Sequence, residues 1–177
     1  MSKTNWNLDP THSEIQFKAK HLMITNVTGN FTAFQVAAES DDDRFTNPRV
    51  TFTAQAGSIN TQNEQRDGHL KSADFFDAEK YPELRFVSTS AGNPDEEGRF
   101  PLTGDLTIRD VTKPVTVQVE FAGVAKDPWG NTKAGFTVTG KINRADFGLV
   151  WNAALETGGV LVSEEIRISA DIQMVKA

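Results

Sequence analysis

Apolar and polar residues alternate with a period of two through most of this chain. In residues 14–20 this alternation places Ile15, Phe17 and Ala19 on one face and charged or amide side chains on the other. The same pattern recurs in five further segments, which are residues 50–56, 100–108, 115–121, 134–142 and 166–172. One solvent-exposed face and one buried face on each segment are typical of antiparallel sheets. We therefore expect a mainly β fold.

Short polar connections separate these segments. Residues 93–98 form an acidic hairpin loop, and residues 127–130 place Asp, Pro and Gly where a type I turn requires them, with Trp129 at the exposed tip. About eight strands joined by short loops predict an antiparallel barrel or sandwich. The chain has 177 residues and contains no linker or internal repeat, so we expect a single domain over residues 1–177.

Two segments break the alternation. Residues 62–80 are neither alternating nor strongly amphipathic, and Gly68 weakens any long helix there. We expect short helical turns packed over one end of the sheet. Residues 144–159 form a second irregular insert, which carries several large apolar side chains.

The inner face of the predicted sheet mixes phenylalanine with very small residues. The small residues are Ala19, Ala54, Ala56, Gly104, Gly123, Ala134, Gly140 and Ala170. Large and small side chains can alternate to fill a tapered core. The small ones can instead leave a channel lined by the large ones, since an eight-stranded barrel is wide enough to hold one small ligand. The pattern alone is compatible with both.

Composition and motifs exclude several functions. A formal net charge of -6 repels phosphate backbones, so we expect no nucleic-acid partner. There is no cysteine, and His12, His21 and His69 do not have metal-ligand spacing, so we expect neither a metal nor a cofactor other than a possible bound isoprenoid lipid. No nucleophile elbow and no glycine-rich phosphate loop is present, so we expect no enzymatic activity.

No window of the sequence approaches the roughly 18 apolar residues of a membrane helix, so we expect a protein that does not span a membrane. The first 14 residues lack the apolar core of a signal peptide. We therefore expect a cytoplasmic location, or a periplasmic one if a leader has been removed.

Four blocks of the sequence resemble the YceI-like family. They lie within residues 9–31, 66–86, 104–115 and 142–148, and they follow one another in family order. The resemblance implies an extended lipocalin-like antiparallel barrel of eight strands that binds polyisoprenoid or related amphiphilic lipids, often as a homodimer. Asp110 stands where the family usually has glycine in a tight turn, and we expect aspartate to tolerate the left-handed conformation there.

The resemblance and the inner face together predict a lipid site. The predicted tail contacts are Phe17, Phe52, Phe86, Leu106, Phe121 and Phe136. The predicted head-group contacts are His21, Arg66 and Arg144. The aromatic residues predicted to flank the mouth are Phe75, Phe76, Phe147 and Trp151. Each has a structural alternative: core packing for the aromatic residues, a structural hydrogen bond for His21, and pairing with Asp67 and Asp146 for the two arginines.

These observations favour a protein that sequesters or carries a long-chain isoprenoid lipid in its barrel. Burial of each methylene contributes about 0.8 kcal/mol, so a tail needs no specific polar contact for tight binding. Two other functions are compatible with the sequence. One is an enzyme that acts on a sequestered lipid, and the other is an interaction module with a filled barrel and an exposed apolar patch.

Overall fold

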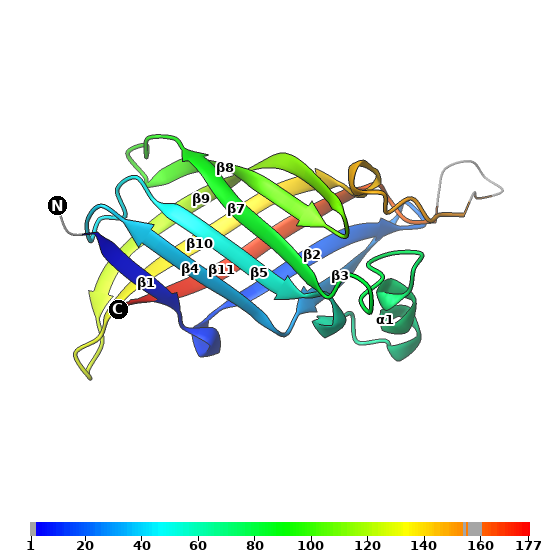
Figure 1. The fold of residues 1–177 in the computed structure, drawn as a ribbon, viewed down its shortest axis with the longest axis horizontal. Helices are drawn as coiled ribbons and strands as arrows, with labels where there is room; N and C mark the ends of the chain where they lie inside the picture. Colours follow the sequence, from blue (N-terminus) through cyan, green and yellow to red (C-terminus); the bar gives the residue numbers. More distant parts are fainter. Residues whose placement is uncertain (1–2, 154, 156–160) are drawn as a thin grey trace.

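The protein is one antiparallel sheet that closes into a barrel, seen in a computed structural model that describes residues 3–153, 155 and 161–177 (Figure 1). The strands of the closed barrel are, in hydrogen-bonded order, β1 (Thr4–Leu8), β4 (Phe34–Ser40), β5 (Arg49–Gln55), β7 (Glu83–Ala91), β8 (Arg99–Ile108), β9 (Val111–Lys126), β10 (Thr132–Asn143) and β11 (Glu165–Lys176). Pairing of β1 with β11 closes the ring. The predicted eight-stranded antiparallel barrel is confirmed.

Three further strands lengthen the barrel at one end. They are β2 (Glu14–His21), β3 (Thr25–Phe31) and β6 (Ile59–Asn60). Strand β11 pairs with β1 near its C-terminus and with β2 near its N-terminus, so β1 and β2 follow each other along the same partner. The short 3-10 helix η1 (Pro10–His12) separates them.

The six alternating segments lie in strands, except that Ala56 at the end of residues 50–56 begins a 3-10 helix, and the predicted turns are present. Trp129 at the β9–β10 turn is 84% exposed, as expected from its position at a tip. The connection between β8 and β9 differs in one detail. Arg109, with a φ of 57°, is the residue in the left-handed conformation, and Asp110 is not. The turn therefore does not require Asp110 to adopt the left-handed conformation.

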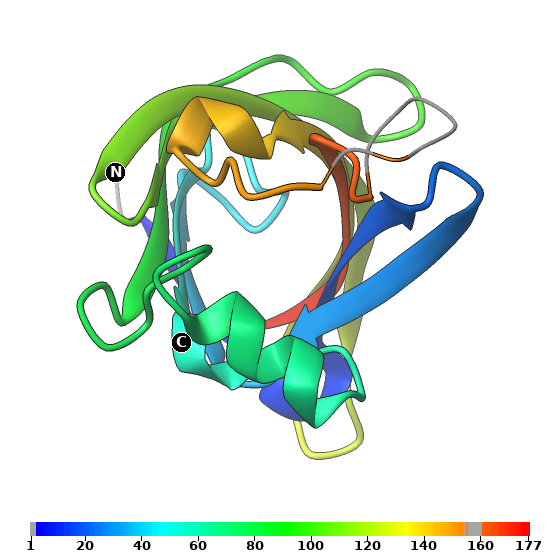
Figure 2. The same cartoon turned by 90° about the vertical axis from the view of Figure 1, so that its right-hand side faces the viewer.

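Short helical segments cover one end of the barrel, as predicted for residues 62–80 (Figure 2). Helix α1 (Glu64–Lys71) begins after Asn63, whose side chain accepts a hydrogen bond from the Arg66 backbone N–H. The 3-10 helix η3 (Arg144–Phe147) lies across the opening from α1, while η2 (Ala56–Ser58) joins β5 to β6. No helix in the described residues is long and apolar enough to cross a membrane.

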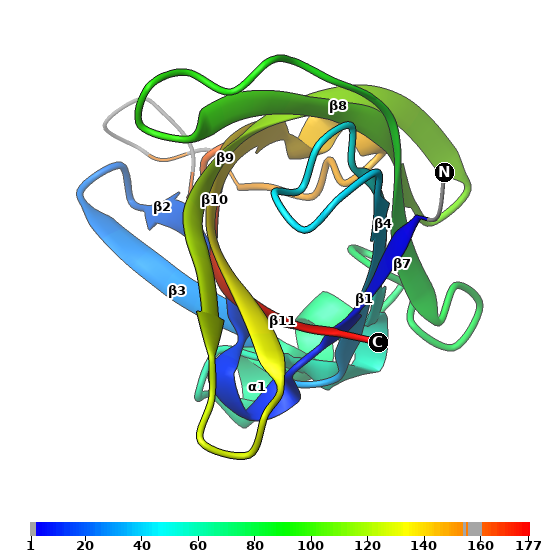
Figure 3. The same cartoon turned by 90° about the vertical axis from the view of Figure 1, so that its left-hand side faces the viewer.

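The opposite end of the barrel is filled by an aromatic plug, which consists of Trp6, Phe45, Phe121 and Phe136. Phe45 belongs to the loop between β4 and β5, which folds into the barrel (Figure 3). Its ring centroid lies 4.4 Å from that of Phe136, 5.5 Å from that of Trp6 and 6.0 Å from that of Phe121. The Trp6 indole N–H donates to the Ser40 hydroxyl, so the polar atom of this buried ring is satisfied.

Two glycines, Gly104 of the small inner residues and Gly29 of β3, accommodate large neighbours. A Cβ at Gly104 would lie 2.5 Å from the Phe86 ring, and a Cβ at Gly29 would overlap the ring of Phe17. The alternation of large and small side chains thus fills space locally at these two positions, as in the first of the two interpretations of the inner face.

Asp9 holds η1 against the barrel from a nearly buried position. Its Oδ2 lies 2.6 Å from Lys133 Nζ and 2.8 Å from His12 Nδ1, and its Oδ1 accepts from the Thr11 backbone N–H. The hydrogen bond from Lys133, followed by that of His12, holds the pKa of Asp9 well below its ordinary value of about 3.8, although burial opposes this.

We expect Asp9→Asn to lower the free energy of unfolding at neutral pH by about 2 kcal/mol, because the hydrogen bond that Lys133 donates loses its charged acceptor. The folded-state pKa is depressed, so this stabilisation is complete above the unfolded-state pKa and declines as pH falls below about 4. The difference between wild type and variant in urea denaturation should shrink over that range. Glu14→Gln, at an exposed neighbouring site, is the control. A difference that is the same at pH 3 and pH 7 would contradict this explanation.

Candidate functional site

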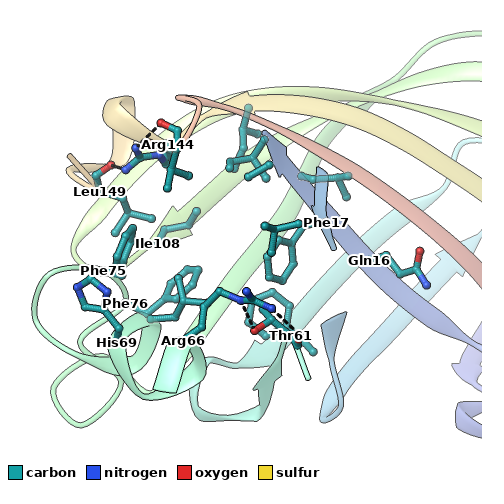
Figure 4. A pocket seen from close by; sticks show the side chains of 18 of the residues that line it. Gln16, Phe17, Thr61, Arg66, His69, Phe75, Phe76, Ile108, Arg144 and Leu149 are labelled. Atoms are coloured by element: carbon teal, nitrogen blue, oxygen red, sulfur yellow. Dashed lines mark hydrogen bonds between the residues drawn. The ribbon is translucent and has the colours of Figure 1, made fainter. Parts of the chain in front are cut away.

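A cavity of about 530 Å³ occupies the half of the barrel beside α1 and η3 (Figure 4). Its wall is mostly apolar because every second residue of the surrounding strands points inward. The apolar residues from strands and from α1 that line it include Ile15, Phe17, Val27, Phe31, Phe52, Leu70, Leu84, Leu106, Ile108, Ile142, Ile166 and Ile168. The volume is within the usual range for pockets that enclose a small molecule.

Nine of the thirteen residues predicted to contact a lipid line this cavity. They are Phe17, His21, Phe52, Arg66, Phe75, Phe76, Leu106, Arg144 and Trp151. The strand residues among them follow from alternation. Arg66 belongs to α1 and is followed by Phe75 and Phe76, while Arg144 belongs to η3 and is followed by Trp151. The structure thus brings residues distant in sequence to one opening.

The other four predicted residues do not line the cavity, so their predicted placement is corrected. Phe121 and Phe136 belong to the aromatic plug, where Phe45 covers them. Phe86 shares the inner face with Phe52 and Leu106, but its ring packs over Gly104. Phe147 is 2% exposed and packs into the core.

Sequence reasoning did not identify Phe45 as a residue of the barrel interior. Its ring fills one end of the barrel and so limits how much of the interior is hollow. The loop that carries it has no alternation, so its pattern does not indicate which way the ring points. The one available signal was a phenylalanine within the otherwise polar residues 41–48. A large apolar residue in a short polar loop favours burial, but not burial at a particular place.

Arg144 is a buried residue on the rim of the cavity, and its side chain connects neighbouring segments by hydrogen bonds. Its guanidinium donates to the backbone carbonyls of Leu149 (2.7 Å), Trp151 (2.9 Å), Ser163 (2.9 Å) and Val162 (3.2 Å). These bonds tie η3 to two other segments of the rim. Burial lowers the pKa of Arg144 from its ordinary value, and the nearby Glu164 carboxylate opposes this change.

The predicted pairing of Arg144 with Asp146 is not found among the hydrogen bonds and ion pairs of the described residues. All four acceptors are neutral carbonyl oxygens. The positive charge of Arg144 is therefore solvated by backbone dipoles rather than neutralised by a carboxylate.

Arg66 and Asp67 both bind Thr61 instead of each other. The Arg66 Nε donates to Thr61 Oγ1 and its Nη2 donates to the Thr61 carbonyl, each at 2.8 Å. Asp67 accepts from the Thr61 backbone N–H at 2.8 Å. The two residues anchor α1 to the end of β6. The structural alternative predicted this anchoring role, but through a pair between Arg66 and Asp67 rather than through Thr61.

His69 is a rim residue to which sequence reasoning gave no binding role. Its ring meets the Trp151 ring edge-on at 4.6 Å and the Phe75 ring at 5.1 Å. Its Nε2 lies 2.9 Å from Asp74 Oδ2. This aromatic contact joins α1 to the segment after η3, so the two sides of the opening are in contact there.

The side chains that surround the cavity are mostly apolar. Across the part of the chain that the structure describes, no three His, Cys, Asp or Glu side chains gather closely enough to hold a metal ion. The cavity wall is dominated by aliphatic and aromatic side chains, and Arg66, His69 and Arg144 lie at the opening, while Gln16 lies farther from it along β2. This arrangement is suited to holding an amphiphile with its apolar part inside.

A closed eight-stranded antiparallel barrel with an apolar internal cavity defines a lipocalin-like protein, the class of small barrels that hold one ligand. The YceI-like domain matches residues 6–174, and the chain belongs to the YceI-like family.

Relatives span the same length as this chain. A UPF0312 protein of Staphylococcus aureus (strain MSSA476) is 42% identical over 171 residues, which are 96% of either chain. The crystal structure of a Campylobacter jejuni YceI protein has a TM-score of 0.74 and 34% identity, covering 89% of this chain and 90% of that one. A polyisoprenoid-binding domain from Saccharophagus degradans shares the fold, with a TM-score of 0.70 and 13% identity over 97% of this chain and 98% of that one.

Proposed function

We propose that this protein binds a long-chain amphiphilic lipid inside its barrel and thereby sequesters or carries it. The observation that supports this most directly is the apolar cavity of about 530 Å³ that opens beside α1 and η3. The structurally similar domain from Saccharophagus degradans is described as polyisoprenoid-binding, which agrees with the same use of the fold.

The energetics of burial are sufficient for this function. Each methylene removed from water contributes about 0.8 kcal/mol, so about ten buried methylenes contribute about 8 kcal/mol before the cost of ordering the chain. Micromolar binding requires about 8 kcal/mol of net free energy. A tail longer than about ten methylenes can supply this after the ordering cost without a specific polar contact along the tail. Polar residues at the opening, such as Arg66 and His69, lie where the head group would sit.

We expect organic extraction of the purified protein, followed by mass spectrometry, to recover a long-chain amphiphile in near-stoichiometric amount. Delipidated protein should bind an added prenyl or acyl lipid with a stoichiometry of one per barrel. A buffer extract taken through the same purification without the protein is the control. Repeated extraction that yields no lipid, together with no binding of added lipids, would exclude the proposal.

A further inference from the structure

The turn between β2 and β3 exposes three large apolar side chains in succession. Leu22, Met23 and Ile24 are 39%, 53% and 74% exposed. The other exposed large apolar side chains that the structure describes stand singly along the chain, at Val87, Val124, Trp129 and Val150. The hairpin projects from the barrel wall at the end that holds the cavity (Figure 2), and His21, directly before the turn, lines that cavity. The turn is therefore an apolar patch beside the opening.

The backbone of this turn does not favour the residues that occupy it. Leu22 and Met23 have φ angles of 54° and 63°. The Ile24 N–H donates to the His21 carbonyl at 3.1 Å and closes the turn around them. Hairpin turns with positive φ at both central residues favour asparagine and glycine, because larger side chains are strained there. These apolar residues are neither buried nor favoured by the turn, which points to a role outside the folded chain.

The outer face of the sheet below this turn is basic. Lys141, Arg167 and Lys18 lie directly opposite one another on β10, β11 and β2. Lys20 lies one outward position nearer the turn. Lys141 and Arg167 share the Glu165 carboxylate at 3.7 and 3.5 Å, and neither Lys18 nor Lys20 has an ion pair with a described carboxylate. Like charges opposite one another destabilise a sheet, so this basic row favours an anionic partner.

The charge of the outer face reverses toward the other end of the barrel. Glu120, Asp171 and Glu14 occupy the row four residues farther from the turn, with Thr137 between the first two. At about 3.4 Å for each residue, this acidic row lies about 14 Å from the basic row. The whole chain has a net charge of -6. The two rows therefore direct the turn, and not the rest of the molecule, toward an anionic surface.

We propose that the protein docks on an anionic lipid bilayer through the β2–β3 hairpin. Leu22, Met23 and Ile24 enter the interfacial layer, where apolar side chains penetrate by about 5–10 Å. Lys20 then lies at the head groups. The basic row, which is about 14 Å from the turn along β2, lies within about one Debye length of them. Apolar insertion and charge attraction thus act at the same site, as in other proteins that bind the surface of a membrane.

This inference goes beyond the proposed function, because the docking surface lies outside the cavity and is not needed to enclose a ligand. Docking holds the opening of the barrel at a bilayer, which gives a lipid a short path between the two. The rim also carries Glu164 and Asp146 near Arg144. The β2 side of the opening, and not the η3 side, therefore faces the bilayer.

Flotation of the full chain with vesicles tests the docking. We expect vesicles of phosphatidylcholine with about 30% phosphatidylglycerol to bind at least about tenfold more tightly than pure phosphatidylcholine, because each basic side chain near an anionic surface is worth about fivefold. Raising the salt from about 0.1 M to about 0.5 M should weaken binding at least about fivefold. Binding to neither kind of vesicle, or equal binding to both, would overturn the proposal.

A matched pair of double variants tests the basic row. Lys18→Gln with Lys20→Gln should weaken binding to the anionic vesicles at least about tenfold. Arg44→Gln with Lys126→Gln removes two exposed cations near the other end of the barrel and changes the net charge equally. This control should weaken binding by less than about threefold. Equal losses in the two double variants would show that net charge alone governs binding, against the proposal.

Leu22→Asn with Met23→Gly separates docking from folding. The new residues suit the left-handed backbone, so the melting temperature should stay the same or rise. Binding to the anionic vesicles should nevertheless fall at least about tenfold, because the inserted side chains are lost. Trp129→Asn removes an exposed aromatic side chain from a turn at the other end and should leave binding unchanged. Full vesicle binding by the stable Leu22→Asn/Met23→Gly variant would overturn the proposal.

A fluorescent label locates the contact. The chain has no cysteine, so Met23→Cys can carry a single environment-sensitive fluorophore. Its emission should rise and shift to shorter wavelength when anionic vesicles are added, whereas the same label on Trp129→Cys should not respond. An unchanged signal at residue 23 in protein that floats with the vesicles would overturn docking through this hairpin.

The outcomes distinguish docking from the proposed function. Delipidated Leu22→Asn/Met23→Gly should bind an added lipid with the affinity of wild type, and loss of lipid affinity together with docking would assign the turn to the cavity instead. Wild type that sediments as a dimer and binds no vesicles, with a monomeric turn variant, would show that the turn contacts a second copy. Either result would overturn docking and leave lipid binding by the barrel in place.

Discussion

Replacing Arg144 with methionine should lower the free energy of unfolding by about 3 kcal/mol or more. The Arg144 guanidinium supplies hydrogen bonds to four backbone carbonyls from residues 149, 151, 162 and 163, and its residue is only 4% exposed. Methionine fills a similar volume but donates nothing, so buried carbonyl oxygens lose their partners at about 1–3 kcal/mol each, reduced where water enters. Urea denaturation followed by circular dichroism measures the change.

The effect should also be local. Hydrogen exchange at the backbone amides of Gly148, Leu149 and Val162 should accelerate more than exchange at amides in β9, because the rim segments lose their common anchor. Arg167→Met, an equivalent change at an exposed residue of β11, should alter stability by less than about 0.5 kcal/mol. Equal effects of the two substitutions would show that the four carbonyl contacts contribute nothing to stability.

Placing a phenyl ring at Ala19 should reduce lipid affinity by at least about thirtyfold. Ala19 lies on β2 and its side chain lines the cavity. The added ring occupies the space of about six methylene groups, each worth about 0.8 kcal/mol to a buried tail, and rearrangement of the tail recovers part of this loss. Titration of delipidated Ala19→Phe with oleate or geranylgeraniol measures the change.

The control for this substitution is Ala125→Phe, which adds the same ring at an exposed position near the end of β9. It should leave affinity unchanged. Thermal unfolding of both variants establishes that the barrel is intact. Full affinity in a folded Ala19→Phe variant would place the lipid elsewhere than in the cavity.

Most of the barrel could be predicted from local patterns. Alternation along β2 correctly indicated that Phe17, Ala19 and His21 share the inner face, and alternation predicts this without any knowledge of the partner strands. Turn residues such as Asp127 and Gly130 marked where strands end, because turn geometry depends on a few adjacent residues. Residues 62–80 were predicted to hold short helical turns because neither alternation nor a strong helical period was present.

Local patterns could not predict which inward side chains fill the barrel and which line the cavity. Phe121 and Phe52 both point inward, yet one belongs to the plug and the other lines the cavity. The difference depends on Phe45, which comes from a loop and reaches rings on strands far away in sequence. The partners of Arg144 are likewise carbonyl groups, which every residue has, so no side-chain pattern identifies them.

The sequence by itself therefore determined the strand faces, the turns and the closed β architecture, because these depend on short-range periodicity and on the burial of one face. Only the tertiary structure decided where the barrel is solid and where it is hollow, and which charges surround the opening. Those properties depend on how side chains from distant segments share one enclosed volume, and local periodicity carries no information about that sharing.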